Sequence, residues 1–385
     1  MDGKKNLATR AAQAGMGFDK QTGSISMPIY QTATFSHPAF GQSTGFDYSR
    51  TANPTRNAVE AAVADLEDGH RAFGFSTGLA ATTALAMLFS AGDHIVASED
   101  MYGGTFRLFE SIFGRFGLQT SYADSTNQAA VAAAIIKGKT KAIFIETPSN
   151  PMMQITDIPA MAKIAHDNGC LLIVDNTFMS PWFQRPIGLG ADLILHSGTK
   201  FLGGHNDTLA GFVVCASAEL SERIFYLQNA TGAVLSPFDS WLILRGIKTL
   251  PIRMERQQQS AQSIVDWLAR HPKVKKIHYP QMAGRPGAAI HAKQASGGGA
   301  MISFQVASGD LAKAMLGAVR VISFAESLGG VETLMTHPLS QTHKDIPAAT
   351  RDRLGIRDDL LRLSVGLEDA TDLIADLAQA LAVNA

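Results

Sequence analysis

The side chains best suited to covalent chemistry gather around one lysine. Lys200 ends the stretch His-Ser-Gly-Thr-Lys, in which Ser197 and Thr199 supply two hydroxyls close to the amine in sequence. The stretch follows an apolar run at 192–196, so the lysine lies at the end of a predicted strand rather than on an open surface. A lysine in such a place can act as a nucleophile that forms an imine with a carbonyl compound.

A carboxylate occupies a similar place on another predicted strand. Asp175 ends the apolar run 171–174 and is followed by Asn-Thr-Phe. In open α/β sheets, ligands bind beyond the carboxyl ends of the strands. Asp175 is therefore either a ligand partner or the cap of a following helix.

The junction at 75–81 is a third feature with chemical potential. It reads Phe-Ser-Thr-Gly-Leu-Ala-Ala, so that a strand end passes through a small polar turn into the start of a helix. Unpaired N–H groups and the positive end of the helix dipole make such a junction suited to a phosphate. A purely structural turn would use the same residues, and the glycine fingerprint of a dinucleotide loop is missing.

Together these three features match what pyridoxal phosphate requires. The cofactor needs an amine that forms a Schiff base, a carboxylate at the pyridinium nitrogen and hydrogen-bond donors for its phosphate. Lys200, Asp175 and the junction at 75–81 would supply one each. The combination predicts this cofactor far more specifically than any of its parts.

The elements that position these residues alternate between strand and helix. Short apolar runs and helix-period stretches alternate from about residue 55, which predicts βα units around a mainly parallel, doubly wound sheet. The first helix begins near Pro54 and ends before Gly69. The predicted strands are 71–75, 94–97, 141–146, 171–175, 192–196 and 211–215, and the helices between them are 79–89, 105–116, 128–137 and 157–168.

The pattern changes after Pro237. A helical stretch at 240–270, with Pro251 as a kink or boundary, predicts a connector to a smaller α+β domain. Residues before 55 show little periodicity; such an arm usually packs on another part of a protein, and a neighbouring subunit is one candidate. The predicted divisions are an arm at 1–54, a large cofactor-binding α/β domain at 55–250 and a C-terminal α+β domain at 251–385, with strands at 300–306, 321–325 and 361–365 and helices at 311–319 and 370–382.

Composition excludes several classes of protein. The chain has 385 residues, 46% hydrophobic and 17% charged, which predicts a globular protein with a large core. Its net charge of -1 provides no field that would hold nucleic acid or an anionic membrane. Cys170 and Cys215 lie in apolar contexts as expected for buried free thiols, and no apolar run suits export or a membrane span. We therefore expect a cytoplasmic protein.

With these residues the sequence resembles the pyridoxal-phosphate enzymes of cysteine and methionine metabolism, which include the cystathionine synthases and lyases and methionine γ-lyase. The resemblance runs from Pro-Ile-Tyr-Gln at 28–31 to the last helix. It implies the aspartate aminotransferase-like fold, fold type I, with Lys200 as the Schiff-base lysine. It further implies that Asp175 keeps the pyridine nitrogen protonated, that Thr177 faces the ring, and that Tyr102 stacks on the other face and helps to move protons.

The resemblance also implies how the phosphate is held. Tyr48 and Arg50, in Tyr-Ser-Arg-Thr-Ala-Asn-Pro, resemble residues that reach the phosphate of a neighbouring subunit. An arginine suits this role as a planar, permanently charged donor. The family usually forms homotetramers built of two dimers with shared active sites. The implied phosphate ligands within one subunit are Gly78, Leu79, Ser197 and Thr199.

The strand predicted at 361–365 carries an arginine with two possible meanings. Apolar residues alternate with Arg362, which turns the arginine away from the apolar face, as an exposed surface arginine would also be. The match to the family's Leu-Arg-Leu-Ser-Val-Gly strand implies that Arg362 clamps the substrate α-carboxylate. Asn150, in Glu-Thr-Pro-Ser-Asn-Pro, and Ser327, in Glu-Ser-Leu-Gly-Gly, resemble residues that fix the cofactor and this carboxylate.

The exact reaction depends on finer resemblances. Glu326 is similar to an acid of the cystathionine γ-synthase and γ-lyase branch, where it can meet the distal amino group of cystathionine or cysteine. Gly104 departs from the cysteine common in methionine γ-lyases. The stretches 41–47, 203–207 and 341–347 look most like bacterial enzymes that join an activated homoserine to cysteine or sulfide. We rank cystathionine γ-synthase first, then cystathionine γ-lyase or β-lyase.

Other functional classes fit the sequence less well. His196 and His205 have no third ligand at useful spacing, so we expect no metal site. No Gly-x-Ser-x-Gly elbow indicates a serine hydrolase. A phosphate-binding regulatory protein that kept the fold and lost turnover remains as the alternative from a different class.

Overall fold

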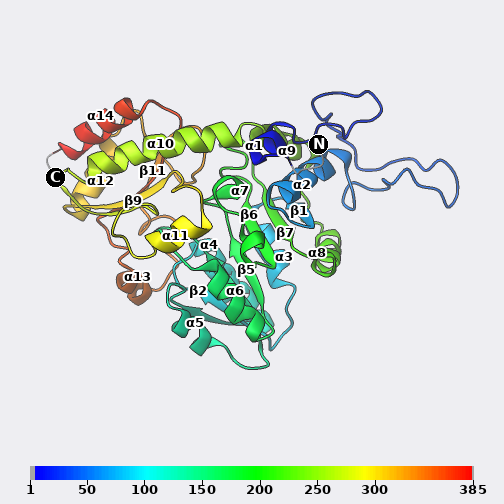
Figure 1. Cartoon of the computed structure of the whole chain (residues 1–385), viewed down its shortest axis with the longest axis horizontal. Coiled ribbons are helices and arrows are strands. Elements are labelled where there is room, and N and C mark those ends of the chain that lie inside the picture. The colour runs from blue at the N-terminus through cyan, green and yellow to red at the C-terminus, as the bar shows by residue number, and fades with distance from the viewer. Residues whose placement is uncertain (1–4, 384–385) are drawn as a thin grey trace.

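Seven strands form the larger of two sheets in the computed structural model, which describes residues 5–383 (Figure 1). Their order is β1-β7-β6-β5-β4-β2-β3, and only β7 runs antiparallel to its neighbours among these pairs. The mainly parallel sheet is therefore confirmed. The strands are β1 (Arg71–Phe75), β2 (His94–Ser98), β3 (Gln119–Ala123), β4 (Thr140–Glu146), β5 (Leu171–Asp175), β6 (Leu193–Ser197) and β7 (Gly211–Cys215).

The central strands are buried on both faces. In β4, Ile143 and Ile145 belong to one apolar cluster, whereas Phe144 between them belongs to the cluster on the opposite face. Helices cover both faces, which is why these strands read as continuous apolar runs. The helices of this part are α2 (Pro54–Leu66), α3 (Gly78–Ala86), α4 (Gly103–Arg107), α5 (Gln128–Ala134), α6 (Ile158–Asp167), α7 (Ser180–Phe183) and α8 (Ala218–Thr231).

The prediction of a single regular helix at 105–116 is wrong. The α-helical hydrogen bonding of α4 stops at Arg107, a π-helical turn follows at Leu108–Ile112, and a 3-10 turn at Phe113–Phe116 completes the segment. Gly117 then adopts a left-handed φ of 87°, which ends the segment. A further 3-10 turn occupies Pro186–Leu189.

A smaller sheet of five strands is formed within residues 5–383, in the order β10-β11-β12-β9-β8. Only β10 (Ser323–Phe324) remains of the strand predicted at 321–325, because that segment pairs with β11 over two residues at the sheet edge. The other strands are β8 (Val274–His278), β9 (Met301–Val306), β11 (Leu334–Thr336) and β12 (Leu360–Ser364). The helices around this sheet are α11 (Ala288–Gln294), α12 (Gly309–Ala318), α13 (Ala348–Leu354) and α14 (Ala370–Leu381).

Two helices connect the sheets. The helical stretch predicted at 240–270 divides into α9 (Pro237–Ile247) and α10 (Leu250–Leu268), with Pro251 in the first turn of α10, where its missing N–H costs little. α10 runs from beside α9 to α14 (Figure 1). One apolar cluster includes Val63 of the first part and Leu363 of the second. The boundaries at 54/55 and 250/251 stay predictions.

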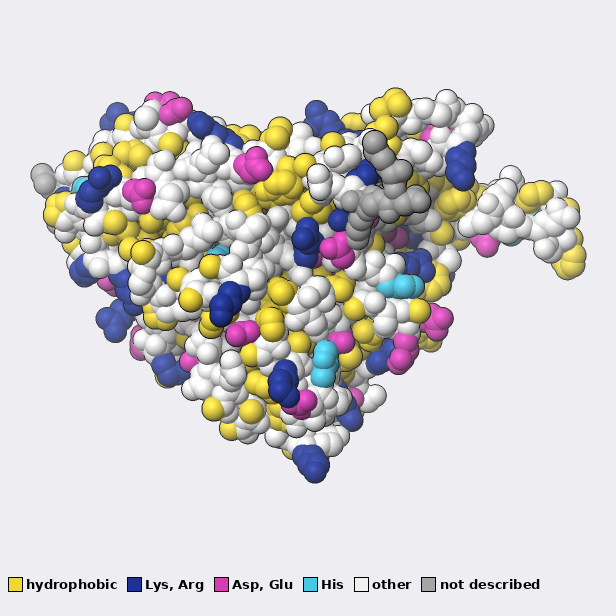
Figure 2. All heavy atoms as spheres, in the orientation of Figure 1, with side chains coloured by type: hydrophobic (Ala, Val, Ile, Leu, Met, Phe, Trp, Pro, Cys, Tyr) yellow, Lys and Arg dark blue, Asp and Glu magenta, His cyan; other side chains and the backbone are white. Residues whose placement is uncertain are grey.

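The N-terminal part projects from the body of the molecule (Figures 1 and 2). After the short helix α1 (Leu7–Ala12), which periodicity did not predict, the chain makes turns and an isolated bridge between Thr34 and Tyr48. Phe40 is fully exposed. Elsewhere Cys170 and Cys215 are buried free thiols, as predicted. No helix within residues 5–383 is long and apolar enough to cross a membrane.

Candidate active site

A cavity of about 430 Å³ lies beyond the carboxyl ends of β4, β5 and β6. Residues of the smaller sheet and its loops close its other side. The cavity brings together every predicted site residue except Tyr48 and Arg50. Those present are Gly78, Leu79, Tyr102, Asn150, Asp175, Thr177, Ser197, Thr199, Lys200, Glu326, Ser327 and Arg362; the lining also includes Thr77, Thr105, Glu146, Phe178, Leu209 and Thr342.

Lys200 extends into this cavity from the turn after β6. Its Nζ donates a hydrogen bond to Ser327 Oγ at 2.7 Å. Burial, together with the positive charge of Arg362, lowers the pKa of the lysine to about 8. A substantial fraction of the amine is therefore neutral near physiological pH, which a nucleophile that attacks an aldehyde requires.

Asp175 is held at the end of β5 by the residues that follow it. Its Oδ1 accepts hydrogen bonds from Thr177 N at 3.0 Å and from Thr177 Oγ1 at 2.5 Å. Thr177 Oγ1 in turn accepts from Ser197 N at 2.9 Å, which ties the ends of β5 and β6 together. Burial raises the pKa of Asp175, and the bonds from Thr177 oppose that shift. A cationic ring nitrogen would stabilise the ionised carboxylate at this place.

The start of α3 presents backbone donors to the same cavity. Thr77 caps the helix, since its hydroxyl accepts from Ala80 N at 2.9 Å. The N–H groups of Gly78 and Leu79, in the first turn, have no partner within the helix. A Cβ at Gly78 would lie 3.0 Å from the Cβ of Ser197, so glycine lets the helix start approach that serine closely. The arrangement suits a phosphate.

Arg362 on β12 is buried, so the interpretation as an exposed surface arginine is wrong. β12 is an interior strand between β11 and β9, and its polar face points at the cavity rather than at solvent. Nη1 donates to Asn150 Oδ1 and Nη2 donates to the Ser327 carbonyl, both at 2.9 Å. Nε is buried without a partner among residues 5–383. The guanidinium is positioned by neutral groups and keeps its charge for a ligand.

Ser327 links the lysine to this arginine. Its φ of 86° lies in the left-handed region that a residue with a side chain rarely adopts. In this conformation its hydroxyl accepts from Lys200 while its carbonyl accepts from Arg362. The backbone strain therefore coincides with the point where two predicted functional groups meet.

Tyr102 and Glu326 lie toward the open side of the cavity. Tyr102 precedes α4, and a Cβ at Gly104 would come within 2.4 Å of its ring, so glycine provides the space in which that ring lies. Glu326 is exposed. It also lines a second hollow of about 870 Å³ that shares Thr77, Thr199, Leu209 and Ser327 with the cavity. A substrate that extends outward from Lys200 would pass this carboxylate.

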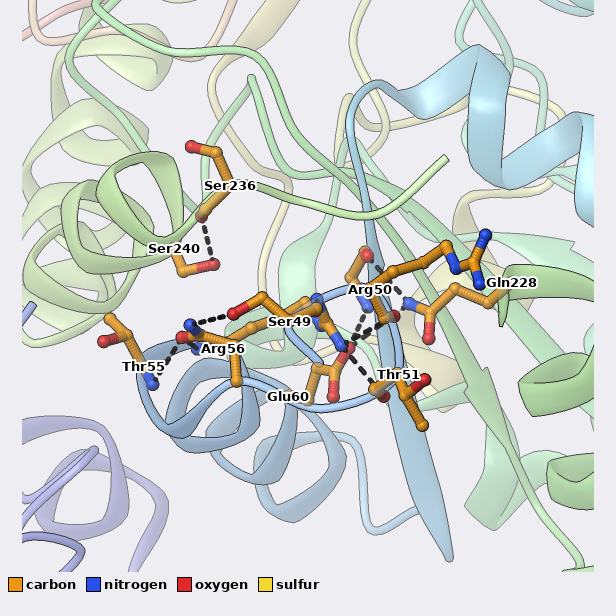
Figure 3. A network of polar contacts seen from close by, with 11 residues as sticks. Ser49, Arg50, Thr51, Thr55, Arg56, Glu60, Gln228, Ser236 and Ser240 are labelled. Atoms are coloured by element: carbon orange, nitrogen blue, oxygen red, sulfur yellow. Dashed lines mark hydrogen bonds and ion pairs between the residues drawn. The ribbon is translucent and has the colours of Figure 1, made fainter. Parts of the chain in front are cut away.

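Tyr48 and Arg50 lie on the exposed arm, outside the described lining of the cavity. The Arg50 guanidinium lies 5.6 Å from the centre of the Tyr48 ring. Figure 3 shows how the base of the arm is fixed: buried Arg56 donates to the carbonyls of Ser49 at 2.6 Å, Arg50 at 3.2 Å and Thr51 at 3.1 Å. The structure therefore does not bring the two arm residues into the cavity of their own chain.

The sequence analysis missed two buried residues that support the site. Glu146 ends β4, and its Oε2 accepts from Tyr102 N at 3.0 Å. His343 is fully buried, and its Nε2 bonds the Asn150 carbonyl at 2.8 Å. Glu146 could have been found, because it ends a predicted strand just as Asp175 does. Nothing in the sequence connects His343 to Asn150.

The two histidines considered as metal ligands have other partners. His196 Nε2 lies 2.5 Å from Glu67 Oε1, and His205 Nδ1 lies 2.7 Å from the Gly203 carbonyl. Within the described part of the chain, no group of three histidine, cysteine or acidic residues could hold a metal ion. These histidines therefore have structural contacts that account for their positions.

The donor set fits pyridoxal phosphate. Lys200 offers an amine of lowered pKa to the aldehyde, and Asp175 offers a carboxylate to the ring nitrogen. The unpaired N–H groups at the start of α3 suit the phosphate. The orphaned Nε of Arg362 suits the carboxylate of an amino acid beside the cofactor. The residues present therefore suit the aldehyde, the ring nitrogen and the phosphate of the predicted cofactor.

Comparisons with known proteins show the family of this chain. A family model described as Cys/Met metabolism PLP-dependent enzyme matches residues 8–382. The chain is 49% identical to cystathionine gamma-lyase of Bacillus subtilis, over 97% of this chain and 98% of that protein. It is 46% identical to cystathionine beta-lyase MetC of the same organism, over 97% and 96%. The solved structure of cystathionine gamma synthase from Xanthomonas oryzae pv. oryzae, in complex with aminoacrylate and cysteine, is 40% identical with a TM-score of 0.96, over 98% of both chains.

Proposed function

The chain belongs to the pyridoxal-phosphate-dependent enzymes of cysteine and methionine metabolism, and we propose that its reaction is the joining of an O-acylhomoserine to cysteine, which yields cystathionine. Family membership confirms the predicted cofactor, the predicted fold type I and the enzyme class. It also sets aside the alternative of a phosphate-binding regulatory protein that kept the fold and lost turnover. Glu326 favours reactions at Cγ over cleavage at Cβ, and the stretches 41–47, 203–207 and 341–347 favour the joining reaction over cleavage at Cγ.

Lys200 and Arg362 perform the steps common to these reactions. When bound, pyridoxal phosphate supplies an electron sink that stabilises negative charge at the substrate Cα. The Arg362 guanidinium holds the α-carboxylate through two of its three nitrogens, which fixes the Cα–H bond near Lys200. The Lys200 amine, once released from the cofactor, removes the α-proton, which its lowered pKa permits. Ser327 holds that amine at hydrogen-bond distance.

Glu326 carries the proposal for chemistry at Cγ. It is exposed at the rim, where the cavity and the larger hollow share lining residues. An amino acid held by Arg362 would extend its γ-substituent toward this rim, and an incoming cysteine would bring its ammonium group beside the carboxylate. Opposite charges there orient the thiol toward Cγ. The Cγ–O bond breaks and the acyloxy group leaves as a carboxylate, while the cysteine thiol loses its proton and its sulfur forms the Cγ–S bond.

Cleavage of cystathionine is the second candidate. The same carboxylate would hold the distal ammonium group of cystathionine, and a relative named cystathionine gamma-lyase is 49% identical. Cleavage at Cγ releases cysteine and 2-oxobutyrate, whereas cleavage at Cβ releases homocysteine and pyruvate. Both routes would use Lys200 and Arg362 in the roles given above.

Product analysis with purified holoenzyme tests the proposal. We expect the enzyme to form cystathionine from O-acetyl- or O-succinylhomoserine and cysteine. The kcat/KM for this reaction should exceed the kcat/KM for the cleavage of cystathionine. Glu326→Gln should raise the KM for cysteine about tenfold and leave elimination from the acylhomoserine without cysteine unchanged. Homocysteine and pyruvate from cystathionine as the main activity would contradict the proposal and identify a β-lyase.

We further propose that two subunits share each site and that the assembly is a homotetramer. Tyr48 and Arg50 are exposed on a projecting arm and lie outside their own cavity. A guanidinium carried by such an arm can reach the phosphate in a neighbouring subunit and bind it through two nitrogens.

A further inference from the structure

We propose that Glu146 carries a proton in the working enzyme, and that as a neutral carboxyl it both positions Tyr102 and leaves the charge of Arg362 available to the substrate carboxylate. Glu146 is thus a positioning residue rather than an acid or base of the reaction. The inference rests on the proposed role of Arg362 in the functional assignment above. It concerns Glu146, to which the functional assignment gave no role.

The geometry places Glu146 between the cofactor carboxylate and the substrate clamp. It is the last residue of β4 and is paired in register with Asp175, the last residue of β5. Its side chain is buried and lines the cavity. Oε2 accepts from Tyr102 N at 3.0 Å, which fixes the residue that precedes α4. An amide oxygen could accept this bond as well as a carboxylate can.

Burial and the two nearest acids disfavour the ionised form of Glu146. Asp175 faces it from β5, and buried Asp100 faces it from the segment after β2. Arg362 on β12, whose positive charge has the opposite effect, and Tyr102 before α4 also lie beside it. Burial, followed by the charge of Asp175, raises the pKa of Glu146 well above its ordinary value. Two adjacent buried acids share one charge more readily than they hold two, and the ring nitrogen selects Asp175 to hold it.

The protonation state of Glu146 matters because of what surrounds Arg362. The hydrogen-bond partners of Arg362 are the Asn150 amide oxygen and the Ser327 carbonyl, which are both neutral. Among the carboxylates near the arginine, Glu146 has the largest electrostatic effect on it. An ionised Glu146 would act as its counter-ion and compete with the substrate carboxylate. Loss of this proton at alkaline pH should therefore weaken amino-acid binding.

A comparison of wild-type and Glu146→Gln holoenzymes tests the inference. The probe is L-alanine, which has no leaving group, and its affinity is read from the change in the visible absorbance of the cofactor. We expect equal affinities at neutral pH. As the pH is raised from neutral, the wild-type enzyme should bind alanine progressively more weakly than the glutamine variant does. The amino group of alanine titrates equally in both experiments, so the ratio of affinities isolates Glu146.

Two results of the alanine titration would overturn the inference. One is a glutamine variant that binds alanine at least tenfold more weakly at neutral pH, because the ionised form would then be required. The other is a ratio of affinities that stays constant with pH. Glu146→Leu, which removes the acceptor for Tyr102 N, should lower the thermal stability of the holoenzyme and change the circular dichroism of its cofactor band. A leucine variant that leaves both unchanged would also contradict the positioning role.

If the assignment of Arg362 as the carboxylate clamp is wrong, the alanine titration should give a different result. Arg362→Ala serves as the matched control in the same alanine titration. If that variant binds alanine as the wild type does, Arg362 is not the carboxylate clamp and the functional proposal is wrong at that residue. If Arg362→Ala loses affinity while the Glu146 ratio does not change with pH, only the inference about Glu146 is wrong.

Discussion

The wall of the cavity and the N-terminal arm both carry predicted ligands, yet they are built in opposite ways. In the cavity, Lys200, Ser327 and Arg362 come from distant segments and are joined by hydrogen bonds within one chain. On the arm, Tyr48 and Arg50 are neighbours in sequence and exposed. If the proposed roles hold, the groups that act together in one subunit are joined by contacts within it, whereas those that would act in another subunit are left projecting. The contrast predicts how mutations in the two regions should differ.

Loss of the lysine should have the largest effect of any single substitution in the cavity. Lys200→Ala removes the amine that we expect to bind the cofactor, so activity should fall by at least about a thousandfold. The visible absorbance of the bound cofactor should no longer show an imine, and borohydride should fix no cofactor to the chain. Covalent attachment retained in this variant, detected by mass spectrometry, would contradict the assignment.

Arg362→Ala should separate substrate binding from cofactor binding. The variant loses a buried, charge-assisted clamp, so the KM for the amino acid should rise about a hundredfold. Cofactor content, measured by absorbance after dialysis, should stay near that of the wild type. If cofactor is lost in parallel with activity, the arginine supports the whole cavity rather than the substrate alone.

Arg50→Ala tests whether the arm acts in another subunit. We expect cofactor affinity to weaken about tenfold to thirtyfold, because a phosphate loses a charge-assisted donor. When this variant is refolded together with Lys200→Ala, mixed dimers should regain partial activity, since one cavity then receives an intact lysine and an intact arm. Each variant refolded alone is the control. No recovery in the mixture would indicate that each cavity is completed within its own chain.

The smallest effect is expected from pH on the capture of cofactor by the apoenzyme. Burial lowers the pKa of Lys200 to about 8, so the neutral amine is a minor form at pH 7 and the major form at pH 9. The rate of imine formation should therefore rise about tenfold between these values and then level off. A rate that continues to rise toward pH 10 would show that the amine has the pKa of an exposed lysine.

How well each element could be predicted depended on where it lies in its sheet. β5 reads Leu-Leu-Ile-Val-Asp and was predicted, because an interior parallel strand is apolar on both faces. β3, Gln-Thr-Ser-Tyr-Ala, and β8, Val-Lys-Lys-Ile-His, were missed. Both are edge strands with a solvated side, where polar residues replace the apolar run. β11 is only three residues long and leaves no periodic signal.

The site residues likewise fall into those that the sequence could predict and those that it could not. Residues that follow a strand end, such as Asp175 and Lys200, could be predicted because the carboxyl ends of strands are where ligands bind. The alternation of apolar residues with Arg362 did not establish that this arginine is buried, because its burial depends on how the two sheets face each other. The contact between His343 and Asn150 joins residues 193 positions apart, and only tertiary packing creates it.

The network around Arg56 has a consequence for how subunits associate. Its guanidinium satisfies the carbonyls of three successive residues, which sets the backbone of the arm's base before any neighbour arrives. Much of the ordering entropy of that segment is therefore lost during folding of the single chain rather than on assembly. In the proposed assembly, a docking subunit would bring Arg50 on a rigid support, and little of the free energy of association would be lost in ordering this segment.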